Sequence, residues 1–176
     1  GHQRLTTRIL VTGATGFVGR ALCSELASAG VTVRALVRDP RQFQGHSGVE
    51  VYPGDVPDSA VLARSTEKVD AIVHLAARVH VMRDTAADPL LEFRRVNVEG
   101  TRLLLRAARE SGVRHLVFAS SVKAVGDATT APWTSRTPPA PSDPYGMSKL
   151  EAERVLLSSG AADGPAITVL RFPLIY

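Results

Sequence analysis

Short apolar runs alternate with longer helical patterns along this chain, and this alternation limits the possible folds more than any other feature. Apolar runs that are too short for buried helices predict strands over 8–12, 31–37, 49–52, 71–75, 113–120 and 167–172. Apolar residues at helical spacing, with Gly30 and Gly112 as caps, predict helices over 17–29, 89–111 and 145–158. Strands separated by helices pair in parallel through right-handed crossovers, so we expect an α/β, doubly wound parallel sheet.

Length and composition favour one globular domain over residues 1–176. Hydrophobic residues make up 44% of the chain and charged residues 22%, which excludes a disordered or fibrous protein. No apolar stretch approaches the roughly 20 residues that cross a bilayer, and no signal peptide precedes the first strand, so we expect no membrane partner. The net charge is +4, but the 21 basic residues are spread along the chain, which argues against nucleic-acid binding.

Cysteine and histidine usage adds two expectations. Cys23 is the one cysteine of the chain, so an intramolecular disulfide is excluded and a reducing cytoplasm is the expected location. His80 and His115 have no acidic or cysteine neighbours at metal-ligand spacing, so we expect structural roles and no metal site. Residues 126–144 are rich in proline and polar residues and predict a long loop, which in a compact domain is usually functional or disordered.

A glycine-rich loop lies between the first predicted strand and the first predicted helix. Gly13 permits the tight turn, Gly16 allows the backbone to approach a pyrophosphate, and Gly19 allows close packing of helix on strand. The start of the helix offers free N–H groups and a partial positive charge to phosphates. We therefore predict a Rossmann-type, three-layer α/β/α dinucleotide-binding domain rather than a merely structural turn. The cofactor contacts expected here are Gly13, Thr15, Gly16, Phe17, Val18 and Gly19.

The end of the second predicted strand bears on which dinucleotide binds. An acidic residue there normally hydrogen-bonds the ribose 2′-hydroxyl of NAD, but Arg38 stands near that position and Asp39 follows it. Because arginine pairs with a 2′-phosphate, the sequence favours NADP(H) over NAD. In the alternative, Arg34 and Arg38 face solvent and Asp39 reaches the ribose. After the third strand, Asp55 and Val56 are candidate contacts of the adenine.

Three residues form a candidate catalytic group. Ser121 ends the fifth predicted strand, and Tyr145 and Lys149 lie one turn apart on the following helix, so their side chains share a face. A lysine ammonium beside a phenol is expected to lower the pKa of Tyr145, and Ser121 can hydrogen-bond a substrate oxygen. The arrangement predicts hydride transfer at a carbon that bears oxygen, with nicotinamide as the hydride carrier.

Together, the glycine loop, the strand-end serine and the Tyr-x-x-x-Lys pattern resemble the extended short-chain dehydrogenases/reductases. More narrowly, they resemble the NAD-dependent epimerase/dehydratase family, as do the stretches 74–77, 95–101 and 170–176. The resemblance implies that Asn97 steadies the active-site backbone and that Lys149 also holds the nicotinamide ribose. Further cofactor contacts implied in the same way are Leu75, Ala76, Ala77, Asn97, Tyr145, Phe172 and Pro173.

The resemblance also implies a substrate class. Family members transfer hydride at C4 of a sugar in a nucleotide sugar, here expected to be UDP-linked, with Tyr145 as the acid/base. The same machinery would suit an NADPH-dependent reductase of a non-sugar ketone or a steroid-like carbonyl, and a non-catalytic NADP sensor is a further alternative. Relatives form dimers through helices in the region of 89–111, so a homodimer is a possible assembly.

Three departures from the family pattern are visible. The chain stops at Tyr176, so the C-terminal region that binds the nucleotide sugar is expected to be absent. Val122 and Lys123 follow Ser121 where 4,6-dehydratases of the family carry an Asp-Glu pair, which argues against that reaction. The segment 33–40 is more similar to NADPH-dependent reductases than to epimerases that retain NAD.

Overall fold

A computed structural model describes residues 7–43, 47–79, 88–158 and 164–173 of the chain. Its sheet contains β1 (Arg8–Thr12), β2 (Thr32–Val37), β3 (Val49–Pro53), β4 (Ala71–His74), β5 (His115–Ser121) and β6 (Ala166–Phe172). The strand order is β3-β2-β1-β4-β5-β6, and every neighbouring pair is parallel. This confirms the predicted doubly wound sheet, in which ligands bind outside the carboxyl ends of the strands near β1 and β4.

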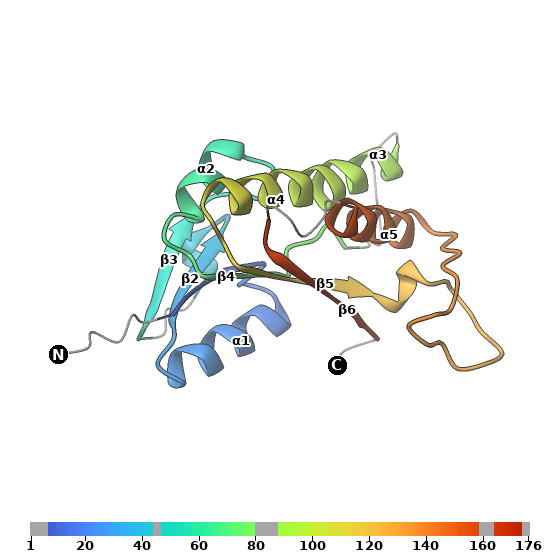
Figure 1. Ribbon diagram of the computed structural model, residues 1–176, viewed down its shortest axis with the longest axis horizontal. Helices are drawn as coiled ribbons and strands as arrows, with labels where there is room; N and C mark the ends of the chain where they lie inside the picture. Colours follow the sequence, from blue (N-terminus) through green and yellow to red (C-terminus); the bar gives the residue numbers. More distant parts are fainter. Residues whose placement is uncertain (1–6, 44–46, 80–87, 159–163, 174–176) are drawn as a thin grey trace.

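Helices cover both faces of the sheet (Figure 1). α1 (Phe17–Ser28) lies on one face, whereas α2 (Ser59–Ser65), α4 (Gly100–Glu110) and α5 (Pro144–Leu157) lie on the other. α2 was not predicted from the sequence. Short turns of 3-10 helix occur at Pro40–Gln42 and Val122–Ala124, and the loop that follows the second of these contains no strand or helix before α5.

The helix predicted over 89–111 is built from three segments. α3 (Pro89–Phe93) leads into a π-helical segment, Arg94–Glu99, and then into α4. A π-segment carries one more residue per turn than its neighbours, so it changes which side chains face the sheet. Here it turns Asn97 and Val98 into the interior, where both are buried.

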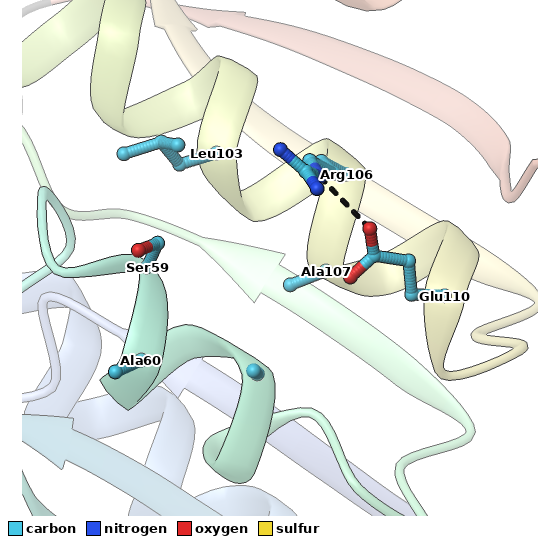
Figure 2. Close-up of a pocket in the computed structure, with 7 residues that line it drawn as sticks. Ser59, Ala60, Leu103, Arg106, Ala107 and Glu110 are labelled. Atoms are coloured by element: carbon cyan, nitrogen blue, oxygen red, sulfur yellow. Dashed lines mark hydrogen bonds and ion pairs between the residues drawn. The ribbon is translucent and has the colours of Figure 1, made fainter.

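α2 packs beside α4 on the outer side of the molecule (Figure 2). A cavity of ≈ 240 Å³ lies between them, with Ser59 and Ala60 on one side and Leu103 and Ala107 on the other. An ion pair with 2.8 Å between Arg106 Nε and a Glu110 carboxylate oxygen borders it. None of the predicted site residues lines this cavity.

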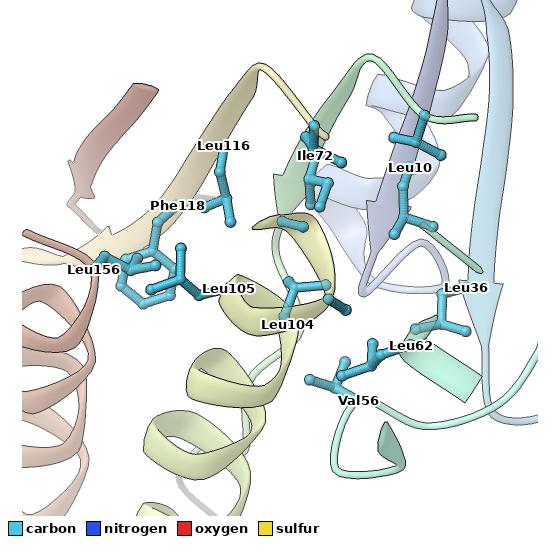
Figure 3. Packing of buried hydrophobic residues seen from close by; sticks show 14 of the residues in the cluster. Leu10, Leu36, Val56, Leu62, Ile72, Leu104, Leu105, Leu116, Phe118 and Leu156 are labelled. Carbon is cyan, nitrogen blue, oxygen red and sulfur yellow. The ribbon is translucent and has the colours of Figure 1, made fainter. Parts of the chain in front are cut away.

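Alternate residues of the strands supply two separate cores. Leu10, Ile72, Leu116 and Phe118 face α4 and α5 and meet apolar side chains such as Leu104 (Figure 3). Side chains one position along, including Val11 and Val33, face α1 instead and surround Cys23. Period-two alternation between two covered faces explains why these strands read as continuous apolar runs. In the part of the chain that the structure describes, no helix has the length and apolar character of a membrane span.

Candidate active site

The glycine loop joins β1 to α1 in the conformation that its spacing predicts. Gly13 has φ +69°, and its carbonyl oxygen accepts a hydrogen bond from the Gly16 N–H at 3.1 Å. A side chain at Gly13 would place Cβ 2.6 Å from the Ala76 nitrogen, and one at Gly19 would overlap the Gly13 carbonyl oxygen. Gly16 precedes α1 without offering a side-chain cap, and the first turn holds no acidic residue. The first N–H groups of α1 are therefore available to an anion.

A cavity of ≈ 510 Å³ opens beside this loop at the carboxyl ends of β1, β2 and β4. Among the sequence-predicted residues, its lining includes Gly13, Thr15, Gly16, Arg38, Asp55, Val56, Leu75, Ala76 and Ala77. It also includes Leu36, Val37, Gly54, Arg78, Val79, Arg95 and Val96, which were not predicted. Arg78 directly follows the stretch 74–77, and Arg95 begins the stretch 95–101. The position of each arginine, next to or within one of these two stretches, was therefore the sequence signal that could have predicted that it lines the cavity.

The remaining predicted cofactor contacts do not line the cavity. They are Phe17, Val18, Gly19, Asp39, Asn97, Tyr145, Lys149, Phe172 and Pro173. Gly19 and Asn97 are buried next to lining residues of the cavity, Gly19 against Gly13 and Asn97 in a hydrogen bond with Arg78. Phe17, by contrast, is 70% exposed. Phe172 lies at the end of β6, paired in register with Ser121. Direct contact of these nine residues with a cofactor stays a prediction.

A buried histidine connects the floor of the cavity to α4. The Ala76 N–H donates to Thr12 Oγ1 at 3.1 Å, and Thr12 Oγ1 lies 2.6 Å from His74 Nδ1. On the other side His74 Nε2 lies 2.9 Å from Thr101 Oγ1, whose hydroxyl donates to the Asn97 carbonyl. The Thr101 proton is thus committed, so His74 donates from Nε2 and accepts at Nδ1. Burial, with a smaller contribution from the Lys149 charge, lowers the pKa of His74 to about 3.

Asn97 joins the cavity wall to α5. Its Oδ1 accepts from the Arg78 N–H at 2.8 Å, and its Nδ2 donates to the Arg78 carbonyl at 3.1 Å and to Ser148 Oγ at 3.0 Å. Ser148 in turn donates to the Tyr145 carbonyl at 2.8 Å. Asn97 is 2% exposed, so these bonds replace solvation of its amide. The π-segment therefore fixes the start of α5 relative to the cavity.

The candidate catalytic residues meet at the carboxyl ends of β5 and the start of α5. Asp143 caps α5 through the Gly146 N–H at 2.7 Å, and Pro144 occupies the first helical turn, so Tyr145 and Lys149 follow on one face. The Ser121 hydroxyl lies close enough to the Tyr145 phenol to lower its pKa. Lys149 Nζ donates to the Ala119 carbonyl at 2.6 Å. The structure thus brings the three predicted residues together.

The electrostatics of this group differ from the expectation. Burial raises the pKa of Tyr145, and the nearby Ser121 hydroxyl, which lowers it, does not compensate. The predicted lowering of the Tyr145 pKa by the Lys149 ammonium is therefore wrong for this structure, in which partial burial of the phenol outweighs the groups that lower its pKa. Burial of Lys149, opposed by the charge of Glu153, lowers the pKa of the lysine itself to about 7.

Arg34, Arg38 and Asp39 have different surroundings at the end of β2. Arg38 is exposed and lines the cavity. Arg34 is 8% exposed and donates to the Ser65 and Glu67 carbonyls at 2.7 and 3.0 Å, so the alternative in which Arg34 faces solvent is wrong. Both carboxylate oxygens of Asp39 accept hydrogen bonds at 2.9 Å from the Arg41 guanidinium.

Comparison with known proteins gives the family. The model of the NAD-dependent epimerase/dehydratase family matches residues 9–176. The chain belongs to this family.

Among the residues that the structure describes, no group of three or more His, Cys, Asp or Glu side chains is placed to hold a metal ion.

Three relatives show which kinds of protein this chain is similar to. A UDP-glucose 4-epimerase from Vibrio cholerae is 34% identical, over 100% of this chain and 54% of its own length. A 3 beta-hydroxysteroid dehydrogenase/Delta 5-->4-isomerase from Mycobacterium tuberculosis is 35% identical, over 97% of this chain and 48% of its own length. The structure of MoeE5 in complex with UDP-glucuronic acid and NAD superposes with a TM-score of 0.83 at 32% identity, over 93% and 54%. The chain therefore spans about half the length of the relatives that it matches.

Proposed function

We propose that the protein carrying this chain is an NAD(P)-dependent nucleotide-sugar epimerase or reductase that acts at C4 of a UDP-linked sugar. The observation that supports this most directly is that Tyr145 and Lys149 lie one turn apart on α5, with the Ser121 hydroxyl close enough to the phenol to lower its pKa. The UDP-glucose 4-epimerase relative and the UDP-glucuronic acid in the MoeE5 structure support the substrate class.

The cavity beside the glycine loop suits a dinucleotide. The start of α1 offers backbone N–H groups that no side chain caps, and Gly13 and Gly16 leave room for a pyrophosphate to approach. Arg38 and Asp55 at the far side would contact the adenosine half. When bound, the nicotinamide would supply or accept the hydride.

Tyr145 would exchange the proton that accompanies hydride transfer. Ser121, whose hydroxyl is near the phenol, would hold the substrate oxygen beside it. Burial raises the pKa of Tyr145, so the phenol carries its proton near neutral pH and suits the direction in which a keto group is reduced.

Substitution of Tyr145 by Phe tests the proposal. In the protein that carries this chain, Tyr145→Phe should slow interconversion of UDP-glucose and UDP-galactose, or reduction of the 4-keto sugar, by about 100- to 10,000-fold. NADH affinity should fall much less than turnover, because the glycine loop and the lining of the cavity are unchanged. Tyr52→Phe, on β3 against Arg34, is the matched control and should retain turnover. Unchanged turnover in Tyr145→Phe would overturn the assignment of the acid/base.

A hydroxysteroid or another non-sugar carbonyl is the second candidate substrate. The relative that supports it is the mycobacterial 3 beta-hydroxysteroid dehydrogenase, at 35% identity. Turnover of a 3 beta-hydroxysteroid with NAD, combined with no turnover of UDP-sugars, would select this candidate. Cofactor binding without turnover of either class would instead favour the sensor.

The preference for NADP(H) is a separate proposal that rests on Arg38. The relatives give it no support, since the MoeE5 complex contains NAD. The geometry favours it, because Arg38 lines the cavity while Arg41 occupies the Asp39 carboxylate. Arg38→Ala should weaken NADPH binding about tenfold in a calorimetric titration and leave NADH binding unchanged. Arg41→Ala is the neighbouring control, and a wild-type chain that prefers NADH would overturn the proposal.

A further inference from the structure

A buried carboxylate lies one helical turn beyond Lys149, and the proposed acid–base step does not use it. Glu153 is 2% exposed and follows Tyr145 and Lys149 at intervals of four residues, so the three side chains share one face of α5. A carboxylate this deeply buried is costly unless hydrogen bonds and an opposite charge compensate it. The partners of Glu153 therefore show what this part of the fold requires.

Each of those partners comes from a different strand. Ser120, directly before the candidate catalytic serine on β5, donates a short hydrogen bond to Glu153 Oε1. Arg171 on β6 donates from Nε to Oε1 at 3.0 Å and from Nη2 to Oε2 at 2.7 Å, a two-pronged ion pair. Glu153 thus ties the middle of α5 to the carboxyl ends of both β5 and β6.

Lys149 is held between the same elements. On its own helix it is flanked by Tyr145 and Glu153. From β5, the Ala119 carbonyl oxygen accepts a hydrogen bond from Lys149 Nζ at 2.6 Å, and the centroid of the Phe118 ring lies 4.2 Å from Nζ. From β4, the neutral His74 is close enough for the Lys149 charge to disfavour its protonation. Among these groups, the negative charge comes from the Glu153 carboxylate. This charge favours the ammonium form of Lys149 and opposes the effect of burial, which lowers the pKa of the lysine.

We propose that the buried Glu153–Arg171 pair is a positioning element of this active site, which fixes α5 on β5 and β6 and sets the charge of Lys149. This inference rests on the proposed function, because it assigns the pair to the machinery that contains Lys149. Glu153 supplies the charge that stabilises the ammonium, and Arg171 limits the strength of that charge. Arg171 and Trp133 both line a cavity of ≈ 430 Å³, and the Arg171 side chain is 27% exposed, so Arg171 is more accessible than Glu153.

The two partners can be separated because their removal has opposite electrostatic signs. Glu153→Gln keeps the shape of the side chain and removes the negative charge beside Lys149, so the lysine should lose its proton at lower pH. Arg171→Gln leaves the Glu153 charge uncompensated, so the lysine should lose its proton at higher pH. A purely structural pair predicts a different result, because looser packing would hydrate Lys149 and raise its titration midpoint in both variants.

The test is a direct titration of Lys149 in the cofactor-free chain. The chain has three lysines, Lys68, Lys123 and Lys149. NMR of ¹³Cε-labelled lysine can therefore be assigned with Lys68→Arg and Lys123→Arg. The expected midpoint moves down by on the order of one pH unit in Glu153→Gln and up in Arg171→Gln. Ser120→Ala, which removes a hydrogen bond without changing charge, should give the smallest change.

The outcomes decide between the alternatives. A midpoint that rises or stays unchanged in Glu153→Gln overturns the proposal. If Glu153→Gln does not fold, Arg171→Gln is compared with Arg171→Lys, which keeps the positive charge but loses the two-pronged geometry. The proposal expects a clearly smaller rise in Arg171→Lys, and an equal rise in both variants, or an unchanged midpoint in Arg171→Gln, overturns it. Failure of the proposed function would appear elsewhere, as a wild-type chain that does not bind NADH or NADPH, because the lysine titration is measured without a cofactor.

Discussion

His74 shows how one buried side chain can couple acidity to stability. Because burial lowers the pKa of His74 to about 3, the folded chain keeps this imidazole neutral where the unfolded chain, with a pKa near 6.5, is protonated. The unfolded state therefore binds more protons between these two values, and the free energy of unfolding falls as the pH drops from about 6.5 toward 3. The contribution of this group is up to about 1.4 kcal/mol per pH unit.

Denaturant unfolding of His74→Gln at several pH values between 7 and 4.5 measures this contribution. The variant should be less stable at pH 7, because it loses the Thr12–His74–Thr101 chain of hydrogen bonds, but its stability should depend less steeply on pH. His115→Gln is the control, since His115 is exposed at the start of β5. Equal slopes for wild type and His74→Gln would show that His74 is not held neutral.

Single residues differ in how far the sequence could predict them. Gly13 and Gly19 are predictable because their requirement comes from the local backbone, which the spacing of the loop encodes. The direction in which the Tyr145 pKa shifts is not predictable in this way, because it depends on how far the phenol is buried beside Phe93. Glu153 was missed for a similar reason, since it lies on α5 and its partner Arg171 is 18 residues away on β6.

The junction of β1 with α1 depends on a close approach of helix and strand. A Cβ at Gly19 would overlap the Gly13 carbonyl oxygen and lie 2.8 Å from the Ala14 Cα, so α1 would have to move off β1. Gly19→Ala should therefore destabilise the chain by about 1–3 kcal/mol in denaturant unfolding. A Cβ at Gly16 would meet the same oxygen at 3.3 Å, so Gly16→Ala should cost less stability and chiefly weaken NADH binding. Equal losses of stability would contradict this division.

Helix prediction failed where distant contacts or short length decide the structure. α2 has seven residues, too few for a periodic apolar pattern, and the signal that remained was Asp58, whose side chain accepts from the N–H groups of Ala60 and Val61. The π-segment within 89–111 was also invisible, because apolar spacing there continues. Within it, Asn97 bonds to Arg78 and Ser148, which lie far from it in sequence and which no local pattern reveals. The six strands, by contrast, were predicted to within two residues at either end. Burial on both faces makes inner strands such as β1 continuously apolar, whereas the edge strands β3 and β6 were found from shorter apolar runs interrupted by exposed residues.

Two cores on opposite faces of one sheet mean that loss of either layer exposes apolar surface. α1 is the helix that covers the second core, and Cys23 lies at its centre with 0% exposure. Burial raises the pKa of the Cys23 thiol to about 11, so in the folded chain the thiolate that reacts with disulfide reagents is scarce at neutral pH. Since this is the one cysteine of the chain, its reaction reports how often the α1 layer opens.

The cofactor cavity links that opening to ligand binding. The glycine loop begins α1, so a dinucleotide bound there stabilises the closed layer and should slow reaction of Cys23 with Ellman's reagent. For opening that is fast and reversible, NADH at ten times its dissociation constant should reduce the rate about elevenfold. The urea-unfolded chain gives the unprotected rate, and Cys23→Ala gives the background. A rate that is unaffected by saturating NADH would mean that α1 separates from the sheet without releasing the ligand, and the site would then have to depend on β4 and the π-segment instead of the start of α1.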